Sequence, residues 1–500
     1  MRRLRSDYSN SLTIRLALTS PTSERGYNVP RPAIHWLNDD ILLGIFDCCR
    51  LHNTNNWNDW NDWNDWNDRL GWRNLSQVCQ RWRYLIYECS SHLGIHIKCT
   101  KGSPLVNTLD HLPLLPLFVH YDYWPHSAST ILEQDELGIY HTLRLRGRIR
   151  HINLSLPPSI LHNALALMNE NFPILEHLFL SCWPSADGGI PLILSKAFLA
   201  LNLHHLTLIG IGLPKRLRLL TSTTSLVTLT LGDIQTSSYF RPRLLVARLQ
   251  SLPLLEELSI GFSTPIPRPS TERELLGEDG APTTLPNLKT LSFRGVGAYL
   301  ESLVAQIRVP LLRQLSIRLF NQIAFVLPHL FYLINNTEVF KLSRATVGFD
   351  RNEVFVDMTQ DHGLGRIAFS FSVRCKPLDW KIDCATQICH ALIPTLSDVE
   401  ELWLLPYYTP TPTEMQNAAI DSAMWHDLLR GFVGVKKLCI STALSEELSR
   451  ALQVDEVGSD PSFLPNLKSI TAEHNLFTSF IITRQGVGRP AQFAMFQAVF

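Results

Sequence analysis

One spacing of apolar residues limits the fold of this chain more than any other feature. It reads aliphatic, two residues, aliphatic, one residue, aliphatic, and it recurs from about residue 149 onward. The middle aliphatics of the first seven copies are Ile152, Leu178, Leu206, Leu229, Leu258, Leu291 and Leu315. Later copies are Val339-Leu342, Leu364-Ile367-Phe369, Val399-Leu402-Leu404, Val435-Leu438-Ile440 and Leu467-Ile470-Ala472. A period of about 20 to 50 residues is typical of proteins built by stacking one structural unit.

The spacing predicts a short strand in each copy. The two aliphatics that flank a single residue point to one side of the strand, and the residue between them points to the other side. Stacking the strands in parallel joins their apolar sides into one core, where each buried Leu or Ile contributes about 1.5 to 3 kcal/mol before ordering entropy is subtracted. We therefore expect an α/β protein with a long parallel sheet.

Prolines separate the copies at several points. The entries Leu252-Pro253, Leu285-Pro286 and Leu464-Pro465 end the preceding helix and lead into the next strand. With these entries the array resembles irregular leucine-rich repeats, which implies a solenoid with a parallel sheet on its concave face. The asparagine that such repeats carry three residues after the last aliphatic is replaced by Trp183, Ile234, Ser263 and Val296. We expect the solenoid over residues 149–480, a transition or degenerate early repeats over 88–148, and a C-terminal tail over 481–500.

Composition argues against several classes of partner. The 500 residues hold 45 Lys and Arg against 45 Asp and Glu, so no overall field favours nucleic acid or an anionic membrane. No run reaches the roughly 18 apolar residues that a membrane span needs. The ten cysteines are scattered without CxxC pairs, as expected for reduced thiols of a cytoplasmic or nuclear protein.

The segment over residues 30–87 predicts a helical module behind a disordered leader over 1–29. The leader is rich in Arg, Ser and Thr, so a mitochondrial presequence is the alternative. One helix is expected from the apolar face of Leu37, Ile41, Leu42, Ile45 and Phe46, with Asn38 or Asp39 as its cap. A second helix is expected over residues 72–87. Two short helices cannot bury this many apolar side chains against each other, so either a partner or the repeats must cover the rest.

The residues of this module carry a second resemblance. The strings Trp36-Leu37-Asn38-Asp39-Asp40-Ile41-Leu42-Leu43-Gly44-Ile45-Phe46 and Leu75-Ser76-Gln77-Val78-Cys79-Gln80-Arg81-Trp82-Arg83 resemble an F-box. In that family the apolar positions pack on the Skp-type adaptor of a cullin-RING ubiquitin ligase. The resemblance assigns adaptor binding to Leu37, Ile41, Leu42, Ile45, Phe46, Val78, Cys79 and Trp82.

The module departs from the F-box pattern at two places. Asn38 stands where the family has proline, although an asparagine cap offsets part of the lost rigidity. The connection over residues 51–71 is long and holds four copies of Trp-Asn-Asp from Trp57 to Asp68. An exposed loop tolerates such an insertion at small entropic cost. The alternative is that the four tryptophans present an aromatic surface to a partner.

The residues between the paired aliphatics are expected to line the concave face. They are Phe179, Thr207, Thr230, Ser259, Ser292, Ser316, Ser343, Ala368, Trp403 and Cys439. Arg294 and Arg318 follow two neighbouring strands and could together bind a carboxylate or phosphate. We take Ser292, Arg294, Ser316, Arg318 and Trp403 as candidate residues for binding a target protein. The plainer interpretation is a solvated strand face with solvated arginines.

Motifs of catalysis do not occur in the sequence. No P-loop, GxSxG elbow or HExxH motif is found, so we expect no catalytic residues, no metal and no cofactor. Cys384, Cys389 and His390 come nearest to a metal cluster, but buried thiols beside a polar histidine are the simpler interpretation. The sequence favours a substrate-recognition subunit that binds a Skp-type adaptor, and through it a cullin. The alternatives are a repeat scaffold without a cullin ligase and an enzyme fused to repeats, which would need a concave pocket of perturbed titratable groups.

Overall fold

The structure is a computed structural model with two compact units, Met1–Leu93 and Gly94–Phe500. It describes residues 36–51, 71–89, 96–102, 114–123, 131–182, 192–214, 218–264, 282–320, 326–359, 367–375, 378–406, 422–453, 464–472, 476–486 and 488–495. The leader and the Trp-Asn-Asp copies lie outside these residues.

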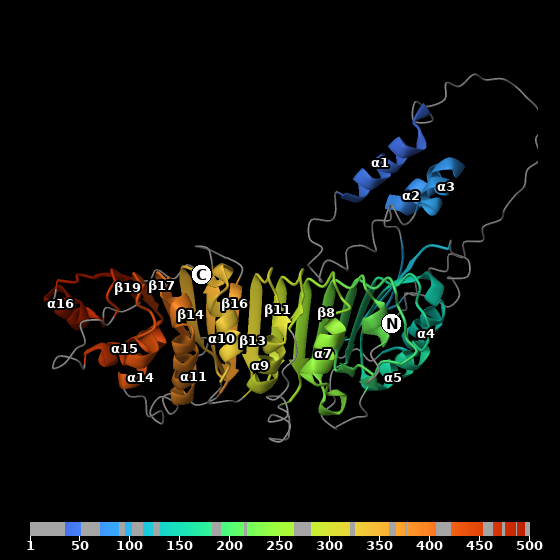
Figure 1. The fold of residues 1–500 in the computed structure, drawn as a ribbon. Helices are drawn as coiled ribbons and strands as arrows, with labels where there is room; N and C mark the ends of the chain where they lie inside the picture. The colour runs from blue at the N-terminus through green and yellow to red at the C-terminus, as the bar shows by residue number, and fades with distance from the viewer. Residues whose placement is uncertain are drawn as a thin grey trace, which may run out of the picture. The chain divides into compact units, whose positions relative to one another are not determined.

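The first unit is helical. It holds α1 (Asp39–Leu51), α2 (Gly71–Val78) and α3 (Gln80–Glu88), and α1 packs against both of the others (Figure 1). The Asn38 side chain accepts a hydrogen bond of 2.9 Å from the backbone N–H of Ile41, so Asn38 is the cap of α1. The single helix expected over residues 72–87 is divided, because Cys79 is extended with φ −159° and ψ 169°.

The second unit is built on one large sheet. Its strands are β1 (Ile97–Thr100), β2 (Leu117–Asp122), β3 (Ile149–Leu156), β4 (His177–Cys182), β6 (His205–Ile209), β8 (Thr228–Ile234), β9 (Glu257–Phe262), β11 (Thr290–Gly295), β13 (Gln314–Leu319), β14 (Arg344–Phe349), β15 (Glu353–Thr359), β16 (Ile367–Arg374), β17 (Glu401–Pro406), β18 (Lys437–Ile440), β19 (Ser469–Ala472) and β20 (Gln492–Met495). All neighbouring pairs are parallel except β14 with β15 and β15 with β16. Two small sheets pair β5 (Leu192–Ile193) with β7 (Ile211–Gly212) and β10 (Thr283–Thr284) with β12 (Ile307–Arg308).

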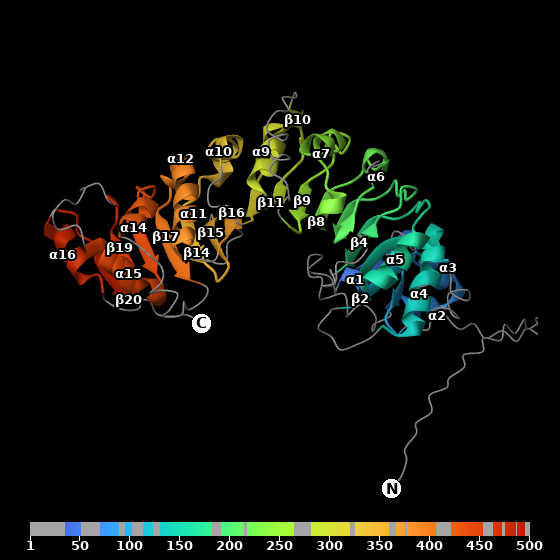
Figure 2. The same ribbon diagram turned by 90° about the horizontal axis from the view of Figure 1, so that it is seen from below.

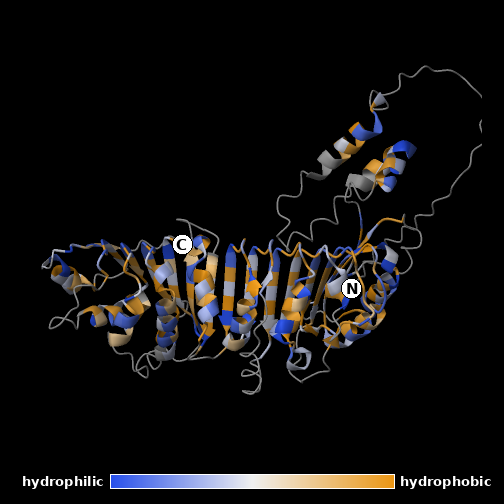
Figure 3. Cartoon of the chain, in the orientation of Figure 1, coloured by the Kyte–Doolittle hydropathy of each residue, from blue (hydrophilic) through white to orange (hydrophobic). Residues whose placement is uncertain are grey.

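The repeated aliphatics form the core as the spacing predicts. Leu258, Leu291 and Leu315 lie in register on neighbouring strands, and each is buried. Most residues between the paired aliphatics alternate with them and are partly exposed, so that hydrophobic and hydrophilic positions alternate along the strands (Figure 3). Cys439 is an exception, because it is buried on β18 and does not line the exposed face as predicted. The prediction of a mixed α/β fold with a large, mainly parallel sheet is confirmed, and the geometry is consistent with a leucine-rich-repeat-like solenoid.

Two of the predicted repeats are placed wrongly. Between β13 and β17 the sheet order is β16, β15, β14. After β13 the chain leaves two strand positions empty and forms β14 beside the later β17, and β15 and β16 then fill the two positions as an antiparallel meander. Ala345 and Val347 are the inward residues of β14, so Thr346 takes the place that we predicted for Ser343. Phe369 and Phe371 pair with Leu315 and Ile317, so the outward residue of β16 beside Ser316 is Ser370 and not Ala368.

The sheet also extends past both predicted ends. Strands β1 and β2 lie in residues 88–148, which favours early repeats over a mere transition there. At the other end, residues 481–500 hold the end of α16 (Thr478–Gly486) and strand β20, which pairs with β19. Early repeats over residues 88–148 were one of the two alternatives predicted, whereas β20 lies in the segment that was predicted to be a tail.

Helices follow most strands of the second unit. They are α4 (Glu133–Arg144), α5 (Pro158–Leu167), α6 (Arg218–Ser222), α7 (Pro242–Leu249), α9 (Gly297–Ala305), α10 (Pro328–Asn335), α11 (Leu378–Ala391), α12 (Ile393–Leu396), α14 (Ser422–Leu429) and α15 (Thr442–Gln453), besides α16. Helices α6, α7, α9 and α10 lie on the outer side of a curve whose inner side is formed by the strands (Figure 2). Pro158, Pro242 and Pro328 each begin a helix, where a missing N–H costs nothing.

Asparagine side chains link consecutive repeats, but they stand before the first aliphatic of a repeat and not three residues after its last aliphatic. The side-chain amides of Asn202, Asn287 and Asn466 donate to the backbone carbonyls of Pro173, Pro253 and Val433, at 2.7, 2.8 and 2.9 Å. Each asparagine stands just before the first aliphatic of its repeat, and each acceptor lies in the corresponding turn of the repeat before it. These bonds satisfy turn carbonyls and link repeats, which is the kind of role that the absent asparagine would have filled.

Candidate functional site

The first candidate surface lies on the helices of the first unit. Of the eight residues assigned to adaptor binding, Ile41, Ile45 and Val78 are exposed, with Ile41 at 50% and Val78 at 59%. Leu37 and Cys79 are half-buried. An apolar side chain loses roughly 1.5 to 3 kcal/mol of favourable free energy by staying in water, so several on neighbouring helices indicate a binding surface.

The other three residues of that set form the core of the first unit. Leu42, Phe46 and Trp82 are buried, and the rings of Phe46 and Trp82 meet edge to face with centroids 5.0 Å apart. Residues 42 and 46 are one helical turn apart on α1, while 41 and 45 form the adjoining stripe. The apolar stripe of α1 is thus wider than its packing against α2 and α3 requires.

An arginine connects α3 to the start of α1. The Arg81 guanidinium donates to Asp39 Oδ1, at 3.0 Å from Nε and 2.6 Å from Nη2, and Nη2 also donates to the Leu37 carbonyl at 2.6 Å. Two donors of one guanidinium on one carboxylate oxygen fix the direction of the helix start. Arg81 therefore positions Leu37 and the exposed stripe, a role that the sequence pattern did not indicate.

The second candidate surface is the outward side of the large sheet. Ser292 lies in register with Ser316, and Arg294 with Arg318, as predicted. Each arginine already has an acidic partner: Arg294 pairs with Asp233 at 3.1 Å, and Arg318 pairs with Glu353 at 2.9 Å. A ligand with a carboxylate or phosphate would have to compete with these two ion pairs.

Trp403 lies between two cations on the same side of the sheet. The Arg344 guanidinium and the Lys437 ammonium come from the strands on either side of β17, with 5.7 and 5.9 Å to the centre of the indole ring. Glu401 lies two residues before Trp403, and its carboxylate binds both cations. Arg344 Nη2 donates to Oε2 at 2.8 Å, and Lys437 Nζ lies 2.9 Å from Oε1. Trp403 is half-buried and held in place.

We expect Glu401→Gln to destabilise the second unit by about 1.5 to 3 kcal/mol at neutral pH, because it removes charged hydrogen bonds and leaves two cations together. Burial opposes ionisation of Glu401, but hydrogen bonds from Lys437 and Arg344 outweigh it and lower the pKa of this carboxyl below 4.5. Its contribution is full above 4.5 and is lost as the pH falls through the lowered pKa. Urea unfolding of both proteins across this range measures the difference, which should shrink at low pH; a constant difference would contradict the ionic explanation.

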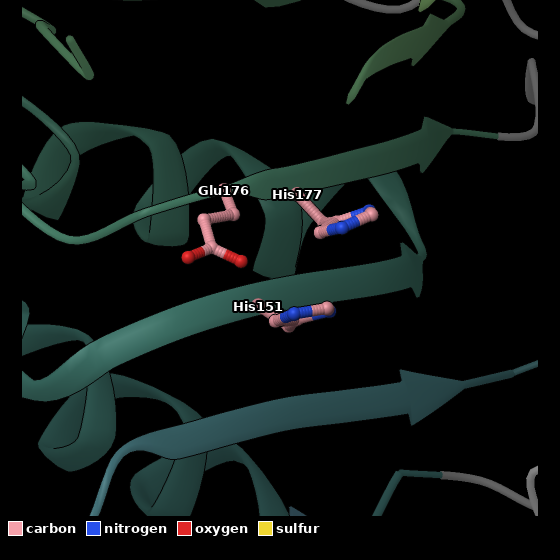
Figure 4. A group of neighbouring side chains, drawn as sticks. All are labelled: His151, Glu176 and His177. Atoms are coloured by element: carbon pink, nitrogen blue, oxygen red, sulfur yellow. The ribbon is translucent and has the colours of Figure 1, made fainter. Parts of the chain in front are cut away.

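One cluster of the second unit was missed by the sequence interpretation. His151, His177 and His205 lie in register on β3, β4 and β6, and their rings stack with centroids 4.1 and 4.2 Å apart. Each stands just before the middle aliphatic of its repeat, so the signal was a histidine at one repeat position in three successive copies. Figure 4 shows His151 and His177 with the carboxylate of Glu176 beside them.

Among the described cysteines, the thiols of Cys375 and Cys384 lie within hydrogen-bond distance of each other, without His390. Cys384 and Cys389 are buried on α11, whereas His390 is exposed and its Nε2 lies 3.0 Å from the Asp427 carbonyl. This arrangement agrees with buried thiols beside a polar histidine. In the part of the chain that the structure describes, no helix combines the length and apolar character that crossing a membrane requires.

Comparisons with known proteins add little to this geometry. No protein-family model matches the sequence, and no curated protein matches it. Among solved structures, the leucine-rich repeat-containing protein LegL7 from Legionella pneumophila is similar with a TM-score of 0.27 and 11% sequence identity, over 80% of this chain and 99% of that one. A TM-score this low carries no argument about the present chain.

Proposed function

We propose that this chain is the substrate-recognition subunit of a cullin-RING ubiquitin ligase and is not itself an enzyme. In this proposal the helical unit binds a Skp-type adaptor and the repeat sheet binds a target protein. The supporting observation is the exposed stripe of Ile41, Ile45 and Val78, since these residues stand at positions where the resembled F-box family contacts its adaptor.

The structure changes which residues make a useful test. Substituting Leu42 or Trp82 removes core contacts, so lost binding could mean only a lost fold. Ile41 and Val78 are at least half exposed, and replacing them with serine leaves the core intact. Tyr84 on α3 is similarly exposed at 63% but is not among the assigned residues, which makes Tyr84→Ser a matched control.

We expect Ile41→Ser combined with Val78→Ser to weaken adaptor binding by at least about 100-fold, because each apolar side chain buried at an interface contributes roughly 1.5 to 3 kcal/mol. Calorimetric titration of the full chain with a purified Skp-type adaptor measures this, with Tyr84→Ser binding like the unmodified chain. Undiminished binding by the double variant, or no binding by the unmodified chain, would reject the surface. Adaptor binding without cullin capture would favour the scaffold alternative.

The target-binding side is proposed from the sheet. Small outward residues such as Ser259, Ser292, Ser316 and Ser370 line the middle of the sheet, and the half-exposed Trp403 stands on β17, three strands beyond β16. A half-exposed tryptophan that its neighbours hold in place is the kind of side chain that anchors a bound protein. We expect Trp403 to contribute more of the target contact than Arg294 and Arg318, whose charges are already paired with Asp233 and Glu353.

A further inference from the structure

The stacked histidines belong to a longer row of flat rings on the outward side of the sheet. His96, Phe118, His151, His177 and His205 stack in this order, with centroid distances from 3.5 to 4.2 Å and interplanar angles from 11° to 21°. Parallel strands in register bring the rings to this spacing, since neighbouring strands lie about 4.8 Å apart. The row is a consequence of repeat register and not of local sequence.

Two imidazoles of the row and one carboxylate come close enough to share an ion. One donor atom each of His151, Glu176 and His177 lies within 4.8 Å of the other two. All three residues are half-buried. Among the described residues, no hydrogen bond is made to a ring nitrogen of His151 or His177. The two rings stack on each other and on the neighbouring rings of the row.

Glu176 is oriented by a neighbour on the next strand. Arg150 Nε lies 2.7 Å from Glu176 Oε2, an ion pair without the alignment of a hydrogen bond. This contact holds one oxygen and leaves Oε1 for a ligand, which is how an outer group commonly fixes a metal-binding carboxylate.

We propose that His151, His177 and Glu176 bind a divalent transition-metal ion of the zinc class on the outward face of β3 and β4. Imidazole with carboxylate suits zinc, nickel and copper better than magnesium or calcium. Zinc bonds of about 2.0 to 2.2 Å require the three donors to approach one another by roughly 1 to 1.5 Å, so His151 and His177 must rotate out of the stack when the ion binds. Three protein ligands leave a fourth position open for water or for a side chain of a bound protein.

The direct test is a zinc titration of the full chain after treatment with a chelator. We expect the unmodified chain to bind one equivalent of Zn²⁺. His177→Asn and Glu176→Gln should bind it more weakly by more than about 100-fold, which is the upper limit for losing an outer-shell partner. The matched control is His162→Asn, because His162 is an exposed histidine on α5, away from the row. Equal zinc binding by all four proteins, or equal loss in the control, would overturn the proposal.

A second measurement needs no variant and so does not depend on how a substituted chain folds. Diethyl pyrocarbonate modifies accessible imidazoles, and peptide mass spectrometry reports each modified position. We expect Zn²⁺ to protect His151 and His177 of the unmodified chain but not His162. Equal modification of His151 and His177 with and without Zn²⁺ would overturn the site. Neither experiment involves the adaptor, so its outcome is independent of the proposed ligase role.

Discussion

Trp82→Ala should unfold the first unit and leave the second unit folded. Trp82 packs on Phe46, and replacing a buried aromatic by alanine costs about 3 to 5 kcal/mol. A core as small as that of Leu42, Phe46, Trp82, Leu85 and Ile86 rarely supplies more than about 3 to 5 kcal/mol in total. The substitution therefore removes nearly all the stability of this unit.

Hydrogen exchange distinguishes the two units in one sample. Amides of α3 should lose their protection in Trp82→Ala, while amides of β11 should exchange as in the unmodified chain, since the two units are separately compact. Tyr84→Ala, at an exposed position of the same helix, is the control and should preserve protection. Protection of α3 unchanged by Trp82→Ala would show that the indole contributes little to the core.

Leu291→Asp should have the largest effect on the second unit. Leu291 is fully buried at the middle of the sheet, between Leu258 on β9 and Leu315 on β13. The aspartate would lose the leucine contacts and place a carboxylate in an apolar core, so we expect a loss of more than about 4 kcal/mol. Urea unfolding followed by circular dichroism measures this loss.

The neighbouring residue provides the control for this prediction. Ser292 follows Leu291 on β11 but points to the other side of the sheet, so Ser292→Asp should change the free energy of unfolding by no more than about 0.5 kcal/mol. In Leu291→Asp, protection should be lost first in β9, β11 and β13, because a repeat contacts mainly its neighbours. Similar effects of the two substitutions would mean that the faces of β11 are assigned wrongly.

The spacing of aliphatic residues predicted correctly those strands whose inward positions hold large aliphatic side chains. Leu258, Leu291 and Leu315 are such positions, and their strands lie where they were expected. The prediction was wrong where a small residue takes an inward place: Ala345 does so in β14, and the search for aliphatics passed over it. In strand β15, Val354, Val356 and Met358 are buried at alternate positions, but the apolar Phe355 lies between two of them, and alternation alone does not specify an antiparallel partner.

The candidate sites were less predictable than the sheet, for physical reasons. Spacing marked Ile41, Leu42, Ile45 and Phe46 as one apolar face, but only packing decides which of them remain exposed. The row of His151, His177 and His205 depends on register between strands, which connects residues far apart in the chain. The acidic partners of Arg294 and Arg318 likewise come from distant strands, so their ion pairs could not be anticipated.

The antiparallel meander has a consequence for how the chain is synthesised. Strand β13 ends at Leu319, but its partner in the sheet is β16, which begins only at Ile367. A ribosome must therefore add β14, β15 and their connections before β13 can be covered, and until then its backbone edge stays unpaired. Stepwise folding, one repeat after another, stops at this point. Delayed long-range pairing of this kind slows folding and leaves the edge of β13 open to aggregation until β16 has been synthesised.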